Sequence, residues 1–112
     1  MTITQKNKLV RDNVPSSITE QGRTPKLRIL SKPEYEKEIF NKLIDEAKEV
    51  IEAKEDPNHL NEEIADVFEV LDTIIKIKNL NLDQIKKIQT DKRNKWGGFD
   101  QQIWLESVTE KE

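Results

Sequence analysis

Four carboxylates with a regular spacing are the residues of this sequence best suited to do chemistry. Glu46 and Glu49 are three residues apart, and so are Glu63 and Asp66. Residues three apart lie on one face of an α-helix, so each pair presents two carboxylates together. Carboxylates gathered at a covered helix interface repel one another and need a counter-charge, which a divalent cation supplies. The spacing therefore indicates a metal site, provided that the two helices pack together.

The amino-acid composition limits which metal ions such a site could bind. The chain has no cysteine and a single histidine, His59, so thiolate zinc sites and two-histidine motifs are excluded. Mg²⁺ takes oxygen ligands, keeps several waters and shares its coordination with substrate phosphates. We therefore expect Mg²⁺, with Mn²⁺ as a substitute, and phosphoryl chemistry. His59 follows the Pro57 turn, and we expect it to be an exposed loop or first-turn residue.

The spacing also has a simpler interpretation. With 22 acidic residues in the chain, carboxylates three apart are expected from composition alone. Each pair in fact continues as a ladder that drifts by about 60° per step toward solvent, so its second half is expected to be solvated. Lysines on the same helices could balance an exposed ladder. From pattern alone the metal site and the solvated face both stay open. The ladders are Glu46, Glu49, Glu52, Glu55 and Glu63, Asp66, Glu69, Asp72.

Periodic apolar residues predict the helices that would position these carboxylates. Ser31 can cap a helix over about residues 33–55, and Asp56 and Pro57 break it. A second helix over about residues 58–79 then forms an antiparallel hairpin with the first. A third helix over about residues 82–95 ends at two glycines. We expect an all-α fold in which oligomerisation completes a four-helix bundle.

The N-terminal segment is expected to be short, irregular and in part extended. Its prolines and Gly22 interrupt any long run of one conformation. Residues 13–21 could form a short helix with Asn13 as its N-cap, and residues 26–30 a short strand or an extended strap. No linker divides the sequence, so residues 1–112 read as a single domain.

Composition and charge limit the partners. The net charge of −3 gives no basic field for nucleic acid, and no apolar stretch reaches membrane-spanning length. The residues after Met1 are polar and form no signal sequence, so we expect a cytoplasmic protein. A chain of 112 residues buries a modest core, which a second subunit could enlarge. Four aromatic residues are expected in the core or in subunit contacts: Tyr35, Phe40, Phe68 and Trp104.

Three motifs in order resemble those of one enzyme family. Residues 45–49 read DEAKE and residues 62–66 read EEIAD. This pair is similar to the EExxE and ExxD motifs of the MazG-like all-α nucleoside-triphosphate pyrophosphohydrolases. Residues 8–15, KLVRDNVP, and residues 92–99, KRNKWGGF, look like the N-terminal signature and the glycine-rich tail of a small subgroup of that superfamily. Together the motifs cover most of the chain.

The resemblance implies a fold, a reaction and a site. Members are helical, pair their subunits into a four-helix bundle, and cleave a nucleoside triphosphate between its α- and β-phosphates with Mg²⁺. By motif position, Glu46, Glu49, Glu63 and Asp66 would be the metal ligands and catalytic residues. We expect a homodimer or homotetramer that acts on nucleotides, including modified or deoxy ones, in a house-cleaning role.

The substrate phosphates would be held by cations near the two ends of the chain. Five basic residues are candidates, because cations at the open end of a bundle neutralise developing charge. Trp96 stands where the subgroup often has Arg, and it could instead stack on a base. Asp45 replaces the first Glu of the family motif. Because its side chain is shorter, we expect it to be solvated or to contact a metal ligand, not to bind the metal itself. The five cations are Lys8, Arg11, Lys92, Arg93 and Lys95.

Two alternatives accompany this hypothesis. Within the superfamily, the substrate could be phosphoribosyl-ATP, which is hydrolysed in histidine synthesis. Outside it, the chain could be a noncatalytic helical interaction module whose acidic ladders are solvated and whose apolar flank is a dimer interface. Dependence on Mg²⁺ separates the enzyme from the module, because a ligand bound only by the folded state raises its stability.

Overall fold

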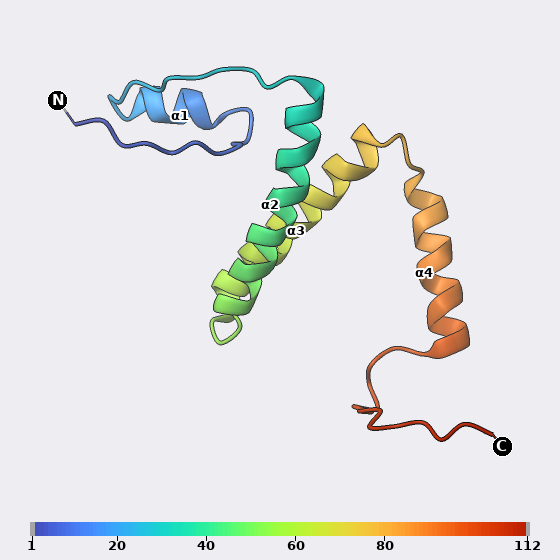
Figure 1. The fold of residues 1–112 in the computed structure, drawn as a ribbon. Helices are drawn as coiled ribbons and strands as arrows, with labels where there is room; N and C mark the ends of the chain where they lie inside the picture. The colour runs from blue at the N-terminus through green and yellow to red at the C-terminus, as the bar shows by residue number, and fades with distance from the viewer. Residues whose placement is uncertain (1, 112) are drawn as a thin grey trace. The chain divides into compact units, whose positions relative to one another are not determined.

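The protein is all-α in the computed structural model, which describes residues 2–111 (Figure 1). The all-α prediction is therefore confirmed, and no strand occurs among these residues. The chain divides into two compact units, Met1–Asn79 and Leu80–Glu112. The predicted helix boundaries agree with those observed to within three residues. The helices are α1 (Val14–Glu20), α2 (Lys32–Glu52), α3 (Pro57–Ile77) and α4 (Leu82–Trp96).

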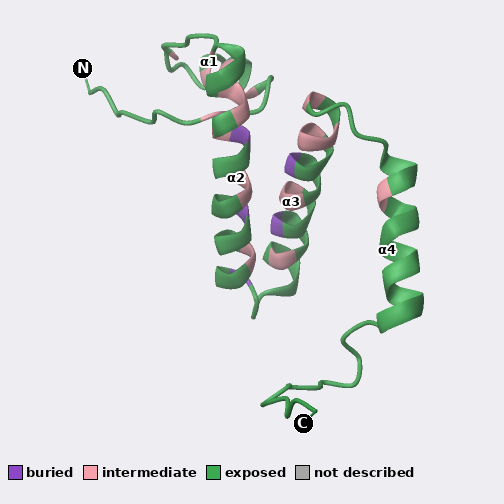
Figure 2. Cartoon of the chain, turned by 45° about the vertical axis from the view of Figure 1, so that its right-hand side comes forward, coloured by how far each residue is buried: buried purple, intermediate pink, exposed green. Residues whose placement is uncertain are grey.

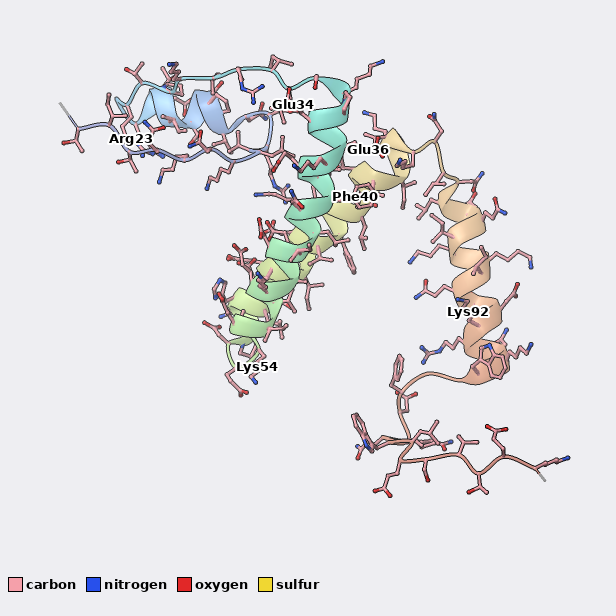
Figure 3. All side chains as sticks on the ribbon, in the orientation of Figure 1. Arg23, Glu34, Glu36, Phe40, Lys54 and Lys92 are labelled. Atoms are coloured by element: carbon pink, nitrogen blue, oxygen red, sulfur yellow. The ribbon has the colours of Figure 1, made fainter. Side chains whose placement is uncertain are left out.

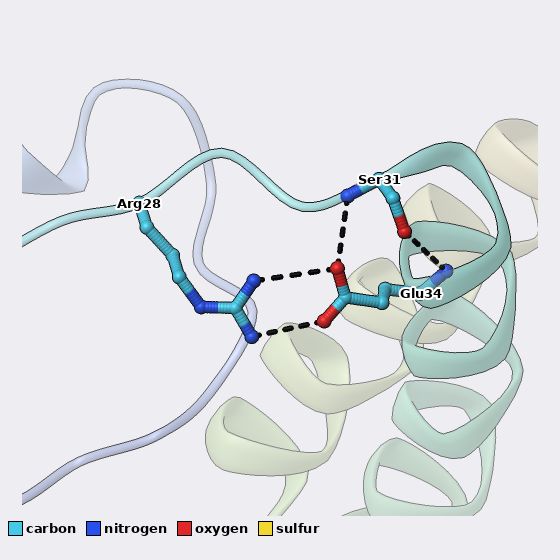
Figure 4. Close-up of polar contacts among 3 residues, drawn as sticks. All are labelled: Arg28, Ser31 and Glu34. Carbon is cyan, nitrogen blue, oxygen red and sulfur yellow. Dashed lines mark hydrogen bonds and ion pairs between the residues drawn. The ribbon is translucent and has the colours of Figure 1, made fainter.

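A capping box starts α2 at Ser31, as the sequence predicts. The Ser31 hydroxyl accepts a hydrogen bond from the Glu34 backbone N–H (3.3 Å), and the Glu34 carboxylate accepts one from the Ser31 N–H (3.1 Å). Arg28 adds two guanidinium hydrogen bonds to the same carboxylate (Figure 4). The hydrogen bonds from Arg28, followed by those from Ser31, lower the pKa of Glu34 to about 2. The Glu34 carboxylate is therefore ionised at neutral pH. Its contribution to the free energy of unfolding is complete above about pH 4.5 and is lost as the pH falls toward about 2.

The turn between α2 and α3 fixes the antiparallel hairpin. Helix α2 ends at Glu52, and the backbone N–H of the C-cap residue Ala53 still donates to the carbonyl of Glu49. Asp56 then caps α3 by accepting a hydrogen bond from the backbone N–H of His59 (3.3 Å), and Pro57 opens the first turn. The two helices run side by side along their lengths (Figures 1 and 2).

The hydrophobic core of the hairpin is small. Among the described residues, the buried apolar side chains are Ile39 of α2, Val70 of α3 and Ala53, the C-cap of α2. Figure 2 shows that the buried positions are few and lie along the hairpin. At the open end of the hairpin, Lys78 forms an ion pair with Glu36. Figure 3 shows Glu36 near the start of α2, and Lys54 in the turn at the opposite end.

Many large apolar side chains remain exposed. Tyr35 is half-buried, but Phe40, Phe68 and Trp104 are exposed in the single chain, so these three are not core residues of the subunit. A contact with a second subunit stays a prediction for them. The hairpin leaves these further apolar residues uncovered: Ile44, Ile51, Ile64 and Leu71.

The N-terminal segment contains the expected short helix. Asn13 is the N-cap residue of α1, as expected, but its side chain makes no capping hydrogen bond. The backbone at Asn13 has a ψ of 2°, outside the extended conformation that usually directs a capping side chain toward the helix. Residues 26–30 form the extended strap rather than a strand.

The second unit consists of α4 and an irregular tail. Asn81 caps α4 by accepting from the backbone N–H of Gln84 (3.0 Å), and Gly97 follows its last residue with a φ of 84°. That positive φ favours glycine at position 97. No described residue of this unit is buried. Over residues 2–111, no helix has both the length and the apolar composition needed to cross a membrane.

The capping box predicts a stability effect. Ser31→Ala removes the hydroxyl that accepts from Glu34, and we expect the free energy of unfolding to fall by about 1 kcal/mol. Urea denaturation followed by circular dichroism measures the change. Ser16→Ala, at an exposed serine of α1, is the control and should have a smaller effect. An equal loss in both variants would show that the cap does not stabilise α2.

Candidate metal centre

The antiparallel hairpin brings the four predicted carboxylates together. Glu46 and Glu49 come from α2, and Glu63 and Asp66 come from α3. One oxygen from each of the four side chains can be chosen so that all four atoms lie within 4.8 Å of one another. Because α2 and α3 run in opposite directions, the middle of one helix faces the middle of the other, and the two i,i+3 pairs meet across the interface. The structure thus selects the first two rungs of each acidic ladder.

Two of the four carboxylates are buried and incompletely paired. Glu46 is 7% exposed and Glu63 is 8% exposed, whereas Glu49 is exposed and Asp66 is half-buried. The Oε2 atoms of Glu46 and Glu63 are buried, and neither has a hydrogen-bond partner among the described residues. Burying an unpaired carboxylate oxygen is costly, and nearly all buried polar atoms in native proteins have a partner. These two atoms therefore mark a place where a bound cation would neutralise the carboxylates and supply the missing partner.

Three basic side chains each contact one oxygen of the cluster. Lys42 Nζ lies 3.7 Å from Oε1 of Glu46, and His59 Nε2 lies 3.0 Å from Oε1 of Glu63. Arg11 Nη2 donates to Oδ1 of Asp66 at 2.7 Å. No ion pair to Glu49 occurs within residues 2–111. The three basic side chains thus contact Oε1 of Glu46, Oε1 of Glu63 and Oδ1 of Asp66, and they leave the buried Oε2 atoms of Glu46 and Glu63 without a partner.

The electrostatics of the cluster follow from burial and from like charges. Burial, followed by the neighbouring Glu49 carboxylate, raises the pKa of Glu46 to about 7. The contact with Glu49, followed by burial, raises the pKa of Glu63. The contacts with Glu63 and then with Glu46 lower the pKa of Glu49. Without a cation the cluster therefore retains protons at a pH where isolated glutamates would be ionised.

The donor set fits a hard divalent cation. Mg²⁺, Mn²⁺ and Ca²⁺ all prefer oxygen ligands, and the four carboxylates supply oxygen atoms within a span that one or two ions could bridge. A bound cation would contact the two unpaired oxygens and displace the retained protons. The residues present therefore suit a divalent metal, and the geometry does not distinguish Mg²⁺ from the other two.

A groove of about 390 Å³ adjoins the carboxylates on the α2 side. Five carboxylates line its wall: Glu38, Asp45, Glu46, Glu49 and Glu52. Three lysines also line it: Lys8 from the N-terminal segment, and Lys42 and Lys48 from α2. The groove thus combines oxygen ligands with ammonium groups, an arrangement that suits an anionic ligand bound through a cation.

The predicted substrate-binding residues fall into two groups. Lys8 and Arg11 lie beside the carboxylates, as described above. Lys92, Arg93, Lys95 and Trp96 belong to the second unit, and their role stays a prediction. There Lys95 Nζ lies 4.6 Å from the centre of the Trp96 ring, and Arg93 pairs with Asp100 at 3.8 Å. Trp96, the two glycines, Asp100, Gln101 and Ile103 line a second groove of about 320 Å³.

Sequence reasoning missed the contact of His59 with the cluster. His59 is an exposed first-turn residue, as expected, but its ring reaches Glu63. The signal was present in the sequence, because His59 and Glu63 are four apart on one helix, a spacing at which side chains meet. Lys42 and Glu46 have the same spacing.

Comparison with known proteins finds no match to a family model, to a curated protein or to a solved structure. The MazG-like resemblance therefore depends on the sequence motifs, and the candidate site depends on its own geometry.

The raised pKa of Glu46 predicts how stability depends on pH without metal. The folded state holds a proton on Glu46 up to about pH 7, whereas the unfolded chain releases it near pH 4.5. The free energy of unfolding should therefore fall as the pH rises between these values. Glu46→Gln removes this loss, so at pH 8 the variant should exceed the wild type by on the order of 2 kcal/mol, with little difference near pH 4.

Chemical denaturation at several pH values in EDTA measures this effect, and metal provides the control. Millimolar Mg²⁺ or Mn²⁺ should raise the melting temperature of the wild type but not that of Glu46→Gln, because the variant lacks one ligand. No shift of the wild type at millimolar metal would favour the noncatalytic interaction module.

The ion pair between Arg11 and Asp66 predicts competition with the metal. Arg11→Gln removes a cation that occupies one ligand, so we expect Mn²⁺ to bind the nucleotide-free protein two- to fivefold more tightly, as suits the loss of an exposed ion pair. Isothermal titration calorimetry measures the affinity. Arg23→Gln, another change in the N-terminal segment, should leave it unaltered. Weaker binding by Arg11→Gln would show that Arg11 supports the site instead.

Proposed function

We propose that the four carboxylates bind Mg²⁺ and that the protein is a nucleoside-triphosphate pyrophosphohydrolase. The observation that carries the proposal is the convergence of Glu46, Glu49, Glu63 and Asp66, with ligand atoms within 4.8 Å and two buried oxygens that lack a partner. An acidic cluster by itself is common. Buried, unpaired carboxylate oxygens are not, and they support a cation at this place.

The donor set leads from a metal to phosphate chemistry. Mg²⁺ bound by carboxylates usually completes its coordination with water and substrate phosphates. The groove beside the cluster offers lysine ammonium groups next to these carboxylates, so a polyphosphate could bridge the two. The motifs that resemble MazG-like enzymes point to the same substrate class, and they specify cleavage between the α- and β-phosphates.

The reaction consumes one water and releases a nucleoside monophosphate and pyrophosphate. A bound divalent ion supplies charge neutralisation and lowers the pKa of a coordinated water. The water oxygen attacks one of the two phosphorus atoms that flank the α–β bridge, and the bond from that phosphorus to the bridging oxygen breaks. One of the four carboxylates takes the proton that the water loses and passes it to solvent.

Basic side chains would hold the phosphates during this step. Lys8 and Lys42 line the groove, and Arg11 reaches Asp66 from the N-terminal segment. Their positive charge would neutralise the charge that develops on the leaving phosphate group. A role of Lys92, Arg93 and Lys95 in holding the phosphate chain, and of Trp96 in stacking on the base, stays a prediction that rests on the motif resemblance.

A homo-oligomer fits the same proposal. The hairpin has two helices and exposes several large apolar side chains that water disfavours, including Phe68 at 62% and Ile51 at 64% exposure. A second copy that covers this surface would complete a four-helix bundle and enlarge the small core. The interaction-module alternative uses the same surface, so oligomerisation alone does not separate the two functions.

Removal of one ligand tests the enzyme. Glu49→Gln keeps the size of the side chain but loses its charge, and we expect pyrophosphate release to fall by at least a hundredfold because both metal binding and proton acceptance are impaired. The assay measures pyrophosphate from common, deoxy and modified nucleoside triphosphates and from phosphoribosyl-ATP, each with Mg²⁺. Circular dichroism establishes that the variant is folded.

Glu69→Gln is the matched control, since Glu69 is an exposed rung of the α3 ladder outside the cluster. Its turnover should equal that of the wild type. Full activity in Glu49→Gln would refute the assignment of the four carboxylates, and activity restricted to phosphoribosyl-ATP would select the alternative substrate.

A further inference from the structure

His59 connects the start of α3 to the carboxylate cluster through two hydrogen bonds. Its backbone N–H donates to the side chain of the capping residue Asp56, at 3.3 Å from Oδ1. Its ring Nε2 lies 3.0 Å from Oε1 of Glu63, one helical turn further along. The helix cap thus fixes the backbone of His59, and the ring in turn contacts a carboxylate of the candidate metal centre.

The contact with His59 makes the two carboxylate oxygens of Glu63 inequivalent. Oε1 is tied to the imidazole, whereas Oε2 is buried and has no hydrogen-bond partner among the described residues. The terminal torsion of a glutamate is soft, so without a partner its two oxygens would exchange places easily. A partner on one oxygen holds the plane of the carboxylate and leaves the other oxygen in a fixed position.

We propose that His59 is a positioning residue, which orients Glu63 so that its free oxygen is available to the divalent cation. The inference rests on the metal site of the proposed function and adds a residue outside the four ligands. Groups that hydrogen-bond to a metal ligand commonly set its orientation and strengthen metal binding.

The exposure of the two side chains separates this role from a structural one. The imidazole side chain is 53% exposed, while that of Glu63 is 11% exposed. Loss of an exposed ring removes little buried apolar area, so the hairpin should keep its stability when His59 is replaced. A change in metal affinity at constant stability is therefore the signature of positioning.

Two substitutions at position 59 test the inference. Mn²⁺ binding to the full-length chain, without nucleotide, is measured by calorimetry and by electron paramagnetic resonance. His59→Ala should weaken binding about tenfold or more. His59→Gln supplies a side-chain N–H of similar reach and should bind within about threefold of the wild type. Lys87→Gln breaks an i,i+4 ion pair in α4 and should have no effect.

Each outcome decides the inference. Unchanged affinity in His59→Ala overturns it, and so does an equal loss in His59→Ala and His59→Gln, which would make the ring itself a ligand. A lower metal-free melting temperature in proportion to the lost affinity would reduce His59 to a structural role. A wild type that does not bind Mn²⁺ removes the metal site and the inference with it. Mn²⁺ binding without hydrolysis leaves the inference intact and refutes only the proposed reaction.

Discussion

Repulsion among carboxylates at the interface of two helices is the constraint on which this structure depends. Glu46 and Glu63 are buried there, each with one oxygen that has no partner, and Glu49 lies close to both. Such an arrangement opposes folding unless protons or a cation neutralise it. The apolar core that could offset this cost is small. The buried carboxylates therefore lower the stability of the hairpin, and a bound cation would account for their position better than a structural role does.

The basic side chains around the cluster come from three different parts of the chain. Lys42 belongs to α2, His59 to the first turn of α3, and Arg11 to the segment that precedes α1. Each contacts a single carboxylate oxygen, so together they reduce the repulsion without closing the site. Because Arg11 and Lys8 belong to the same short segment, that segment brings basic groups next to the acidic cluster and its groove.

The second unit contributes a different chemistry. None of its described residues is buried, and the aromatic side chains of Trp96, Phe99 and Trp104 are exposed. A helix with no buried face of its own gains little from packing, so its stability depends on its cap at Asn81 and on the charge of its last turn. The exposed aromatic residues suit contact with a nucleobase or with another subunit.

The sequence by itself determined the local structure, because its causes are local. Apolar periodicity, the Ser31 cap and the break at Pro57 define the hairpin, and the i,i+3 spacing places each carboxylate pair on one face of its helix. The sequence also singled out the first two rungs of each ladder, through their drift toward solvent and the motif resemblance. The tertiary structure decided that these rungs meet, because this depends on the register between α2 and α3. The burial of Glu46 and Glu63, with their unpaired oxygens, and the contact between Arg11 and Asp66 depend on residues that are far apart in the chain. Helical periodicity carries no information about such contacts. The spacing of His59 and Glu63 allowed their contact, but only packing left the second oxygen of Glu63 buried without a partner.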